Sequence, residues 1–195
     1  MSAVALPAIA GADRLIAVVG PSGAGKDSVL RGWRASLGPV APAVARRMIT
    51  RPPDDSESHE PATPGDFAGL RDRGLLATWW HAHGLDYGVR RSELAPLAEG
   101  RWVVLNGSRA HLPALRLQAP GVRVVCVSAP AHVLAARLAS RGREDTQARG
   151  ARLARAVAAP VASDLELVND GDLGECVAAL SRWWAALTSG APRQR

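Results

Sequence analysis

The segment 18-VVGPSGAGKDSVL-30 constrains the fold more than any other part of the chain. Residues 20–26 follow the pattern G-x-x-x-x-G-K, and loops with this pattern wrap a phosphate group in backbone N–H groups. An apolar run precedes the loop and a helical pattern follows it, which is the context that such a loop requires. The positive end of the helix dipole then points at the same phosphate. The segment therefore predicts a nucleotide-binding α/β domain.

Lys26 is the only lysine in a chain whose lysines and arginines together number 24. An ammonium group is compact and mobile, so it can follow the β- and γ-phosphates during transfer, whereas the rigid guanidinium fork would not fit the same space. We therefore expect Lys26 to be catalytic. The residues expected to bind the nucleotide cofactor, ATP, are Gly20, Pro21, Ser22, Gly23, Ala24, Gly25, Lys26, Asp27 and Ser28.

Asp27 occupies the position where such loops normally have Ser or Thr. A carboxylate beside a triphosphate is repulsive unless a cation lies between them, and Mg²⁺ prefers oxygen ligands of this kind. We therefore predict that Asp27 binds Mg²⁺ and that Ser28 assists. The alternative is that Asp27 only stabilises the N-terminus of the helix.

Apolar and helical patterns alternate along the chain. Strands are predicted at 14–20, 44–51, 101–106, 122–129 and 164–169. Helices are predicted at 25–36, 109–118 and 130–141; a further helix extends to about 159, and the last helix runs from Asp172 to about 190. This alternation favours a parallel sheet covered by helices on both faces, the architecture of P-loop NTPases. We expect one domain over residues 13–190, preceded by a flexible tail at 1–12. Polar segments at 51–90 and 141–149 interrupt the pattern, the first with a short helix and short strands.

Composition narrows the range of partners. A hydrophobic fraction of 47% suffices for a core, and no apolar run is long enough to cross a membrane. The net charge of +6 comes from scattered arginines and the aromatic fraction is only 4%, so we expect a phosphorylated small molecule rather than a nucleic acid as partner. Two cysteines and no signal-peptide pattern favour a cytoplasmic location.

Further motifs place the chain near a known family. These are 47-RMITRPP-53, 83-HGLDYG-88, 137-RLASRGREDTQARGARLARA-156 and 168-VND-170. With the phosphate loop they resemble the guanylate-kinase-like nucleoside monophosphate kinases over roughly residues 13–187. The resemblance implies that 51–90 is an acceptor-binding insert, that 141–149 belongs to a lid, and that Asn169 and Asp170 flank adenine.

Three departures from the guanylate kinases point to a different acceptor. Asp27-Ser28 replaces Ser-Thr, Asp54 replaces a second arginine, and the segment 105-LNGSRAHLP-113 lacks the acidic residues that read guanine. These features resemble the branch of the family that phosphorylates ribose 1,5-bisphosphate with ATP, giving 5-phosphoribosyl 1-diphosphate (PRPP) in phosphonate breakdown. An acceptor that is already a phosphate dianion needs no general base, and the sequence offers none.

The resemblance also assigns roles to individual residues. It implies that Arg47, Thr50, Arg51 and Tyr87 bind the acceptor, and that Arg137, Arg141 and Arg152 act catalytically from the lid. Asn106 ends a predicted strand on the ligand side of the sheet, so we expect it to bind a sugar hydroxyl or a Mg²⁺-bound water. Alternatively, the arginines are solvated surface charges, Tyr87 is a packed aromatic ring, and Asn106 only forms a turn.

Other functions remain open at this level. One alternative is a guanylate-type nucleoside monophosphate kinase. Another is a non-catalytic interaction module, although such modules tend to lose the phosphate loop that is intact here. A nucleic-acid binder is a further alternative, and the chain could form a homodimer.

Overall fold

The computed structural model describes residues 6–52, 58–140 and 161–190. The chain divides into two compact units: unit 1 comprises Met1–Ala17 and Pro42–Arg123, and unit 2 comprises Val18–Ala41 and Val124–Arg195. Strand β1 (Leu15–Val19) begins in unit 1 and ends in unit 2. All five of its residues are buried, as a continuous apolar run in a parallel sheet should be, so the predicted strand at 14–20 is confirmed.

Unit 1 contains one part of a parallel sheet. Its strands follow the order β2 (Ala43–Ala45), β7 (Val103–Asn106), β1, and β2 runs parallel to β7. Every residue of β7 is buried, and the strand ends at Asn106. Helix α4 (Leu112–Gln118) follows β7, and the short elements η1 (Ala12–Arg14), η3 (Arg91–Leu94) and α3 (Ala95–Ala98) complete this part of the unit.

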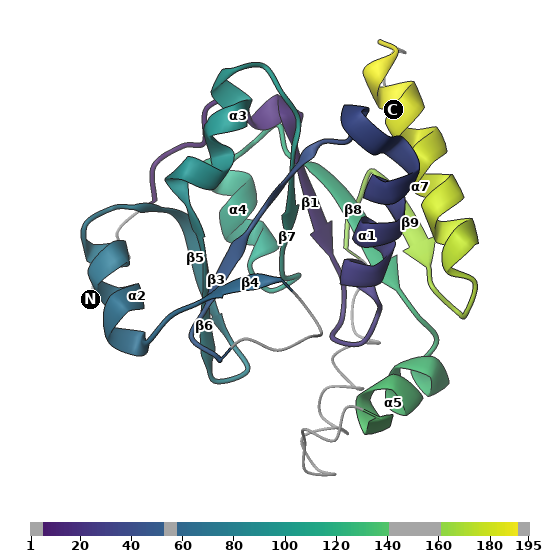
Figure 1. The fold of residues 1–195 in the computed structure, drawn as a ribbon, viewed down its shortest axis with the longest axis horizontal. Helices are drawn as coiled ribbons and strands as arrows, with labels where there is room; N and C mark the ends of the chain where they lie inside the picture. The colour runs from purple at the N-terminus through teal and green to yellow at the C-terminus, as the bar shows by residue number, and fades with distance from the viewer. Residues whose placement is uncertain (1–5, 53–57, 141–160, 191–195) are drawn as a thin grey trace. The chain divides into compact units, whose positions relative to one another are not determined.

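Unit 1 also contains a second, mixed sheet (Figure 1). Its order is β4 (His59–Pro61), β3 (Arg47–Ile49), β6 (Leu85–Arg90), β5 (Leu76–Ala82). Strands β5 and β6 form a hairpin, and the positive φ angles of His83 and Gly84 suit its tight turn. Helix α2 (Pro64–Asp72) packs on this sheet through a core of Met48, Phe67, Leu70 and Leu76.

The predicted single strand at 44–51 is wrong. The chain forms two strands there, β2 and β3, which belong to different sheets. The interruption is at Arg46, whose backbone N–H donates to the Glu93 carboxylate at 2.8 Å instead of to a neighbouring strand. Two successive arginines cannot both lie in a strand buried on both faces, because their side chains would point to opposite faces and both charges would have to leave water.

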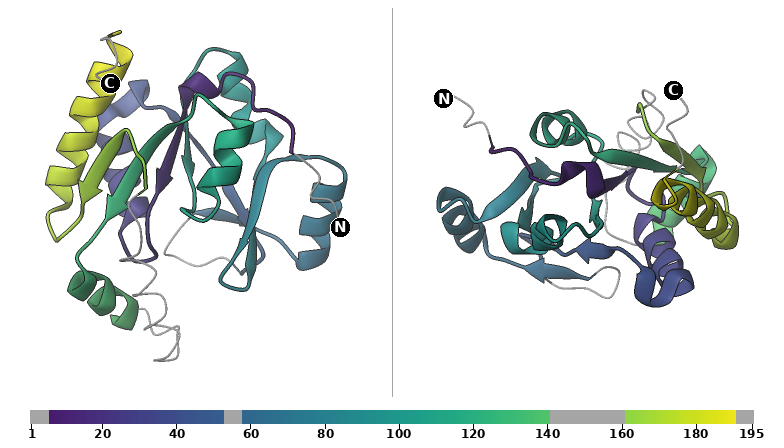
Figure 2. Two further views of the ribbon diagram at one scale, coloured as in Figure 1. Left: turned by 180° about the vertical axis from the view of Figure 1, so that it is seen from behind. Right: turned by 90° about the horizontal axis from the view of Figure 1, so that it is seen from above.

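Unit 2 continues the parallel sheet in the order β1, β8 (Arg123–Ser128), β9 (Leu165–Val168). Helices α1 (Lys26–Leu37) and α7 (Leu173–Thr188) lie side by side (Figures 1 and 2). Trp33 of α1 meets Trp184 of α7 edge-on, with ring centroids 5.6 Å apart. Asp172, where the sequence predicts this helix to begin, caps α7: its carboxylate accepts hydrogen bonds from the backbone N–H groups of Gly174 and Glu175. Unit 2 also holds η2 (Gly38–Val40) and α5 (Ala131–Ser140).

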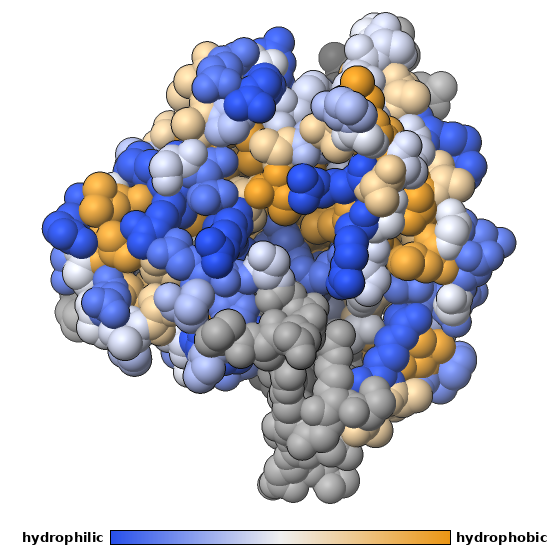
Figure 3. Space-filling model, in the orientation of Figure 1, coloured by the Kyte–Doolittle hydropathy of each residue, from blue (hydrophilic) through white to orange (hydrophobic). Residues whose placement is uncertain are grey.

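Large apolar side chains at the surface are scattered. Val40, Leu75, Leu117 and Val168 are the exposed large hydrophobic residues in the described part of the chain, and they lie on different segments. Hydrophilic and hydrophobic residues are interspersed on the face shown in Figure 3. None of the helices within the described ranges has the length and apolar character needed to cross a bilayer.

Candidate active site

The phosphate loop connects β1 to α1, as predicted. Residues 20–25 form it, and Lys26 is the first residue of α1. Gly23 and Gly25 both adopt φ of 85°, a backbone conformation that favours glycine. Gly25 is the N-cap of the helix and has no side chain to accept hydrogen bonds from the first-turn N–H groups. This leaves a helix N-terminus with the geometry that binds phosphate.

Two loop glycines are also required by neighbouring groups. A Cβ atom on Gly20 would overlap the carbonyl oxygen of Val127 in β8, and one on Gly25 would overlap the side-chain amide of Asn169. The loop thus passes against the end of β8 and against the residue that follows β9. Its path is determined by packing as well as by local backbone preference.

Lys26 folds back over the loop. Its ammonium Nζ donates hydrogen bonds to the carbonyl oxygens of Gly20 and Pro21, both at 3.0 Å. The charge is therefore held against the backbone of the loop, where it can reach a phosphate that the loop binds. Together with the uncapped N-terminus of α1, this donor set fits the triphosphate of a nucleotide.

Asp27 and Ser28 lie in the first turn of α1, and the Asp27 side chain is partly buried while Ser28 is exposed. The described residues contain no group of three or more His, Cys, Asp or Glu side chains that could hold a metal ion. A Mg²⁺ ion at Asp27 would therefore complete its shell with phosphate oxygens and water, which is how Mg²⁺ commonly binds in kinases. One carboxylate and one hydroxyl fit that role.

Arg137, near the end of α5, lies against the phosphate loop. Its guanidinium donates long hydrogen bonds to the carbonyl oxygens of Gly23 (3.5 Å) and Asn169 (3.2 Å) and to the Asn169 side-chain oxygen (3.4 Å). Asn169 is buried, and its own side-chain amide donates to the carbonyl of Ala24 at 2.8 Å. Arg141, Arg152 and the predicted lid at 141–149 lie outside the described residues.

The predicted acceptor residues Arg47, Thr50, Arg51 and Tyr87 all belong to the second sheet or to the turn after β3. Thr50 is tied to the start of β6 twice: its hydroxyl accepts from the Asp86 backbone N–H at 2.9 Å, and its own N–H donates to the Asp86 carbonyl at 3.1 Å. The Arg51 carbonyl lies 3.3 Å from Nε2 of the buried His59 in β4. Backbone contacts on both sides therefore hold the T-R-P turn.

Tyr87 is part of an aromatic stack. Its ring lies parallel to that of Trp80, its partner across the β5–β6 hairpin, with centroids 5.4 Å apart. Trp80 also stacks on His111, just before α4, at 4.8 Å. Stacking on Trp80 limits the orientations of the Tyr87 ring.

His111 belongs to a buried polar network in unit 1. Burial lowers the pKa of His111 to about 4, so its ring is neutral at pH 7. The Thr78 hydroxyl donates its only proton to the Gln118 side-chain oxygen at 2.8 Å. It must therefore accept from Nε2–H of His111, 2.6 Å away. Gln118 in turn donates to the carbonyl of Ala77 at 3.0 Å.

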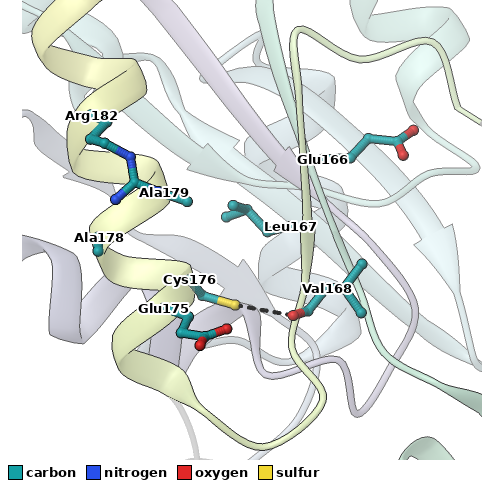
Figure 4. A pocket seen from close by; sticks show the side chains of 8 residues that line it. All are labelled: Glu166, Leu167, Val168, Glu175, Cys176, Ala178, Ala179 and Arg182. Atoms are coloured by element: carbon teal, nitrogen blue, oxygen red, sulfur yellow. Dashed lines mark hydrogen bonds between the residues drawn. The ribbon is translucent and has the colours of Figure 1, made fainter.

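Asn106 is buried at the carboxyl end of β7, where the sequence predicts it. A hollow of about 410 Å³ lies elsewhere, between β9 and α7 (Figure 4). Its lining includes the buried Leu167 and Cys176 as well as Glu175 and Arg182. It contains none of the predicted site residues.

Comparisons with known proteins decide the family. No protein-family model matches the chain. It is 50% identical over 158 residues to a ribose 1,5-bisphosphate phosphokinase PhnN from Acidiphilium cryptum, covering 80% of this chain and 84% of that protein. It is 45% identical over 167 residues to the enzyme of the same name from Burkholderia mallei, covering 84% and 91% respectively. The chain belongs to the ribose 1,5-bisphosphate phosphokinase PhnN family.

Membership in the PhnN family makes the chain a kinase, which confirms the predicted phosphotransferase class. The crystal structure of guanylate kinase from Anaplasma phagocytophilum superposes with a TM-score of 0.65 at 18% identity, covering 93% of this chain and 86% of that one. At this identity the similarity concerns the fold alone, and it confirms the predicted α/β architecture of P-loop kinases.

Two features of this PhnN-family site were not predicted. The first is the contact of Asn169 with the loop: the V-N-D motif drew attention to Asn169, but only as a flank of adenine. The second is the stacking of Trp80 on both Tyr87 and His111; the sequence carries no signal for the contact with His111, because 31 residues separate Trp80 from His111 along the chain.

Proposed function

We propose that the chain transfers the γ-phosphate of ATP to the 1-phosphate of ribose 1,5-bisphosphate, giving PRPP and ADP. The observation that carries the proposal is the phosphate loop, in which the Lys26 ammonium is held over the Gly20 and Pro21 carbonyls at the uncapped start of α1. The names of relatives that are 45–50% identical supply the acceptor.

The transfer exchanges one phosphorus–oxygen bond for another. An oxygen of the acceptor's 1-phosphate forms a bond to the γ-phosphorus, the bond from that phosphorus to the β,γ-bridging oxygen breaks, and ADP leaves with the bonding electrons. The acceptor oxygen is already ionised at pH 7, so no base is needed. The protein has to position the two phosphates and neutralise their charge.

Charged and polar groups divide this work between them. Lys26 and the loop N–H groups bind the β- and γ-phosphates, and Arg137, Arg141 and Arg152 neutralise charge on the moving phosphoryl group. Mg²⁺ on Asp27 and Ser28 would supply further charge neutralisation. Arg47, Thr50, Arg51 and Tyr87 bind the acceptor's phosphates, and Asn106 binds a sugar hydroxyl. The amide of Asn106 is neutral, which argues against guanine as the acceptor's base.

The proposal also covers the partner, the pathway and the location of the reaction. A small phosphorylated sugar, rather than a nucleic acid, is the partner, and the reaction belongs to phosphonate breakdown in the cytoplasm. The two cysteines of the chain, Cys126 in β8 and the buried Cys176 in α7, fit a protein of a reducing compartment.

An acceptor panel tests the proposal. ADP release is followed in a coupled assay with ribose 1,5-bisphosphate, ribose 5-phosphate and GMP, and the product is identified by ³¹P NMR as a diphosphate ester. We expect turnover with ribose 1,5-bisphosphate alone, and its loss in Lys26→Met. Turnover of GMP but not of the sugar bisphosphate would support the guanylate-type alternative instead.

A further inference from the structure

Asn169 connects three parts of unit 2 through one buried side chain and its backbone. Its side-chain amide donates to the Ala24 carbonyl of the phosphate loop at 2.8 Å. Its side-chain and backbone oxygens accept from Arg137 of α5. Its backbone N–H donates to the carbonyl of Ser128, the last residue of β8, at 2.8 Å. Only 3% of the residue is exposed, so water cannot replace these partners.

The chemistry of the two sides determines how the amide is oriented. The Ala24 carbonyl oxygen lies on one side of the side chain and the Arg137 guanidinium on the other, and at neutral pH the Asn169 carboxamide offers a donor to the first and an acceptor to the second. Aspartate would place an oxygen against the Ala24 carbonyl. A larger residue would collide with the loop, because the Asn169 amide already occupies the space beside Gly25.

We infer that Asn169 is a positioning residue for the nucleotide: it holds the phosphate loop and the Arg137 guanidinium in one fixed arrangement before the triphosphate binds. The inference rests on the proposed function, since it assigns Asn169 to the ATP side of the transfer. Asn169 binds the loop at the Ala24 carbonyl and binds the Arg137 guanidinium, so it acts through the loop and through Arg137.

Asn169 favours nucleotide binding because it orders the phosphate loop and Arg137 before the nucleotide arrives. The hydrogen bonds from Arg137 to Gly23 and Asn169 hold the guanidinium beside the loop, and because they are long, a phosphate oxygen can become a further acceptor. The bond from Asn169 to Ala24 is short and buried, and it keeps the loop in its phosphate-binding shape. A site that is already ordered loses less conformational entropy when the ligand binds.

The test measures binding of MgADP by calorimetry, which does not depend on the identity of the acceptor. We expect Asn169→Asp to weaken MgADP binding about 10-fold or more, since it replaces a buried hydrogen bond by a repulsion. The KM for the acceptor should change less than twofold. The matched control is Glu166→Gln, an exposed change on β9 three residues away, which should bind MgADP like the wild type.

Lowering the pH separates positioning from a general structural defect. When the introduced carboxyl group is protonated it can donate to Ala24 again, so the MgADP affinity of Asn169→Asp relative to wild type should recover as the pH falls. A protein that is merely damaged would not recover. If Asn169→Asp does not fold, Asn169→Ser keeps the test open, because it removes both contacts without adding charge; we expect a similar loss.

A double variant tests the link to Arg137. If the two residues act together, Asn169→Ser should weaken MgADP binding less in an Arg137→Ala background than in the wild type. MgADP binding within twofold of wild type in folded Asn169→Asp or Asn169→Ser overturns the inference. Failure of the sugar bisphosphate as an acceptor, with these binding changes intact, would overturn only the proposed function.

Discussion

Gly20 passes so close to the carbonyl oxygen of Val127 that a methyl group on residue 20 would overlap that oxygen. The contact places the start of the phosphate loop against β8, and the φ of Gly20, 154°, is one that side chains rarely permit. The first glycine of the motif is therefore required by its tertiary neighbour as well as by the turn.

Gly20→Ala should lower the free energy of unfolding by about 1–3 kcal/mol, because the backbone of β8 or of the loop has to shift. Urea denaturation measures the change. The control is Gly69→Ala in α2, where nothing lies within 4 Å of the new methyl group. That change should stabilise the protein by about 0.5–1 kcal/mol. Equal effects from the two substitutions would contradict the packing argument.

Lys26→Arg should reduce kcat by about 100-fold to 1000-fold although it keeps the charge, because the wider guanidinium cannot occupy the place of an ammonium held between two loop carbonyls. The coupled ADP assay measures it. The reverse exchange on the same helix, Arg31→Lys, is the control: Arg31 is exposed, and activity should not change. Full activity in Lys26→Arg would show that only the charge matters.

Asp27→Ala should weaken ATP binding in the presence of Mg²⁺ and leave it unchanged, or slightly stronger, in EDTA. The reason is that the carboxylate attracts the metal but repels the bare triphosphate. Calorimetric titrations with and without Mg²⁺ measure the difference. If the substitution lowers stability alone and the Mg²⁺ dependence stays as in wild type, Asp27 serves the helix N-terminus instead.

Arg51→Ala should raise the acceptor KM about 10-fold or more and leave the affinity for MgADP unchanged, since its loss removes one charge-assisted contact to a phosphate. Steady-state kinetics with each substrate varied separately resolve the two effects. Arg101→Ala, a change at an exposed arginine that pairs with Glu99, is the matched control. A parallel loss of ADP affinity in Arg51→Ala would argue against a dedicated acceptor role.

Stability should fall between about pH 6.5 and pH 4 because of His111. Its folded-state pKa of about 4 lies below the ordinary histidine pKa of 6.5, so between these pH values the imidazole is protonated in the unfolded chain but not in the folded protein. The contribution is fully present above pH 6.5 and is lost as the pH falls through 4. It amounts to roughly 3 kcal/mol.

Urea denaturation at pH 7 and pH 5 measures this dependence. His111→Asn should be less stable than wild type at pH 7, because it breaks the contact with Thr78 and the stack on Trp80. It should also lose part of the pH dependence. His132→Asn, at an exposed histidine on α5, should retain it. An unchanged slope in His111→Asn would assign the effect to other groups.

Much of unit 2 could be predicted because its signals are local. Apolar runs produce β1, β8 and β9, the glycine pattern produces the loop, and Asp172 begins α7 with a cap that depends only on the next few residues. Lys26 could be assigned for the same reason, since the motif holds its position relative to the glycines.

The segment 44–51 could not be predicted correctly from local pattern. Whether it forms one strand or two depends on Glu93, 47 residues away along the chain, whose carboxylate accepts a hydrogen bond from the Arg46 backbone N–H. The short helix and short strands within 51–90 were predicted, but the sheet that joins them to β3 was not, because β3 is three residues long and pairs with β4 and β6 from distant parts of the chain. The acceptor residues were assigned by resemblance, and their roles stay predictions.

The sequence alone determined the phosphate loop, its lysine and the strand–helix alternation around it, because hydrogen bonding and burial within a short segment decide these features. Only the tertiary structure decided how the loop is held. Val127, Arg137 and Asn169 lie more than 100 residues beyond it in the chain and reach it through β8, α5 and the residue after β9. Contacts at such separations depend on how the strands order themselves in the sheet, which no local pattern encodes.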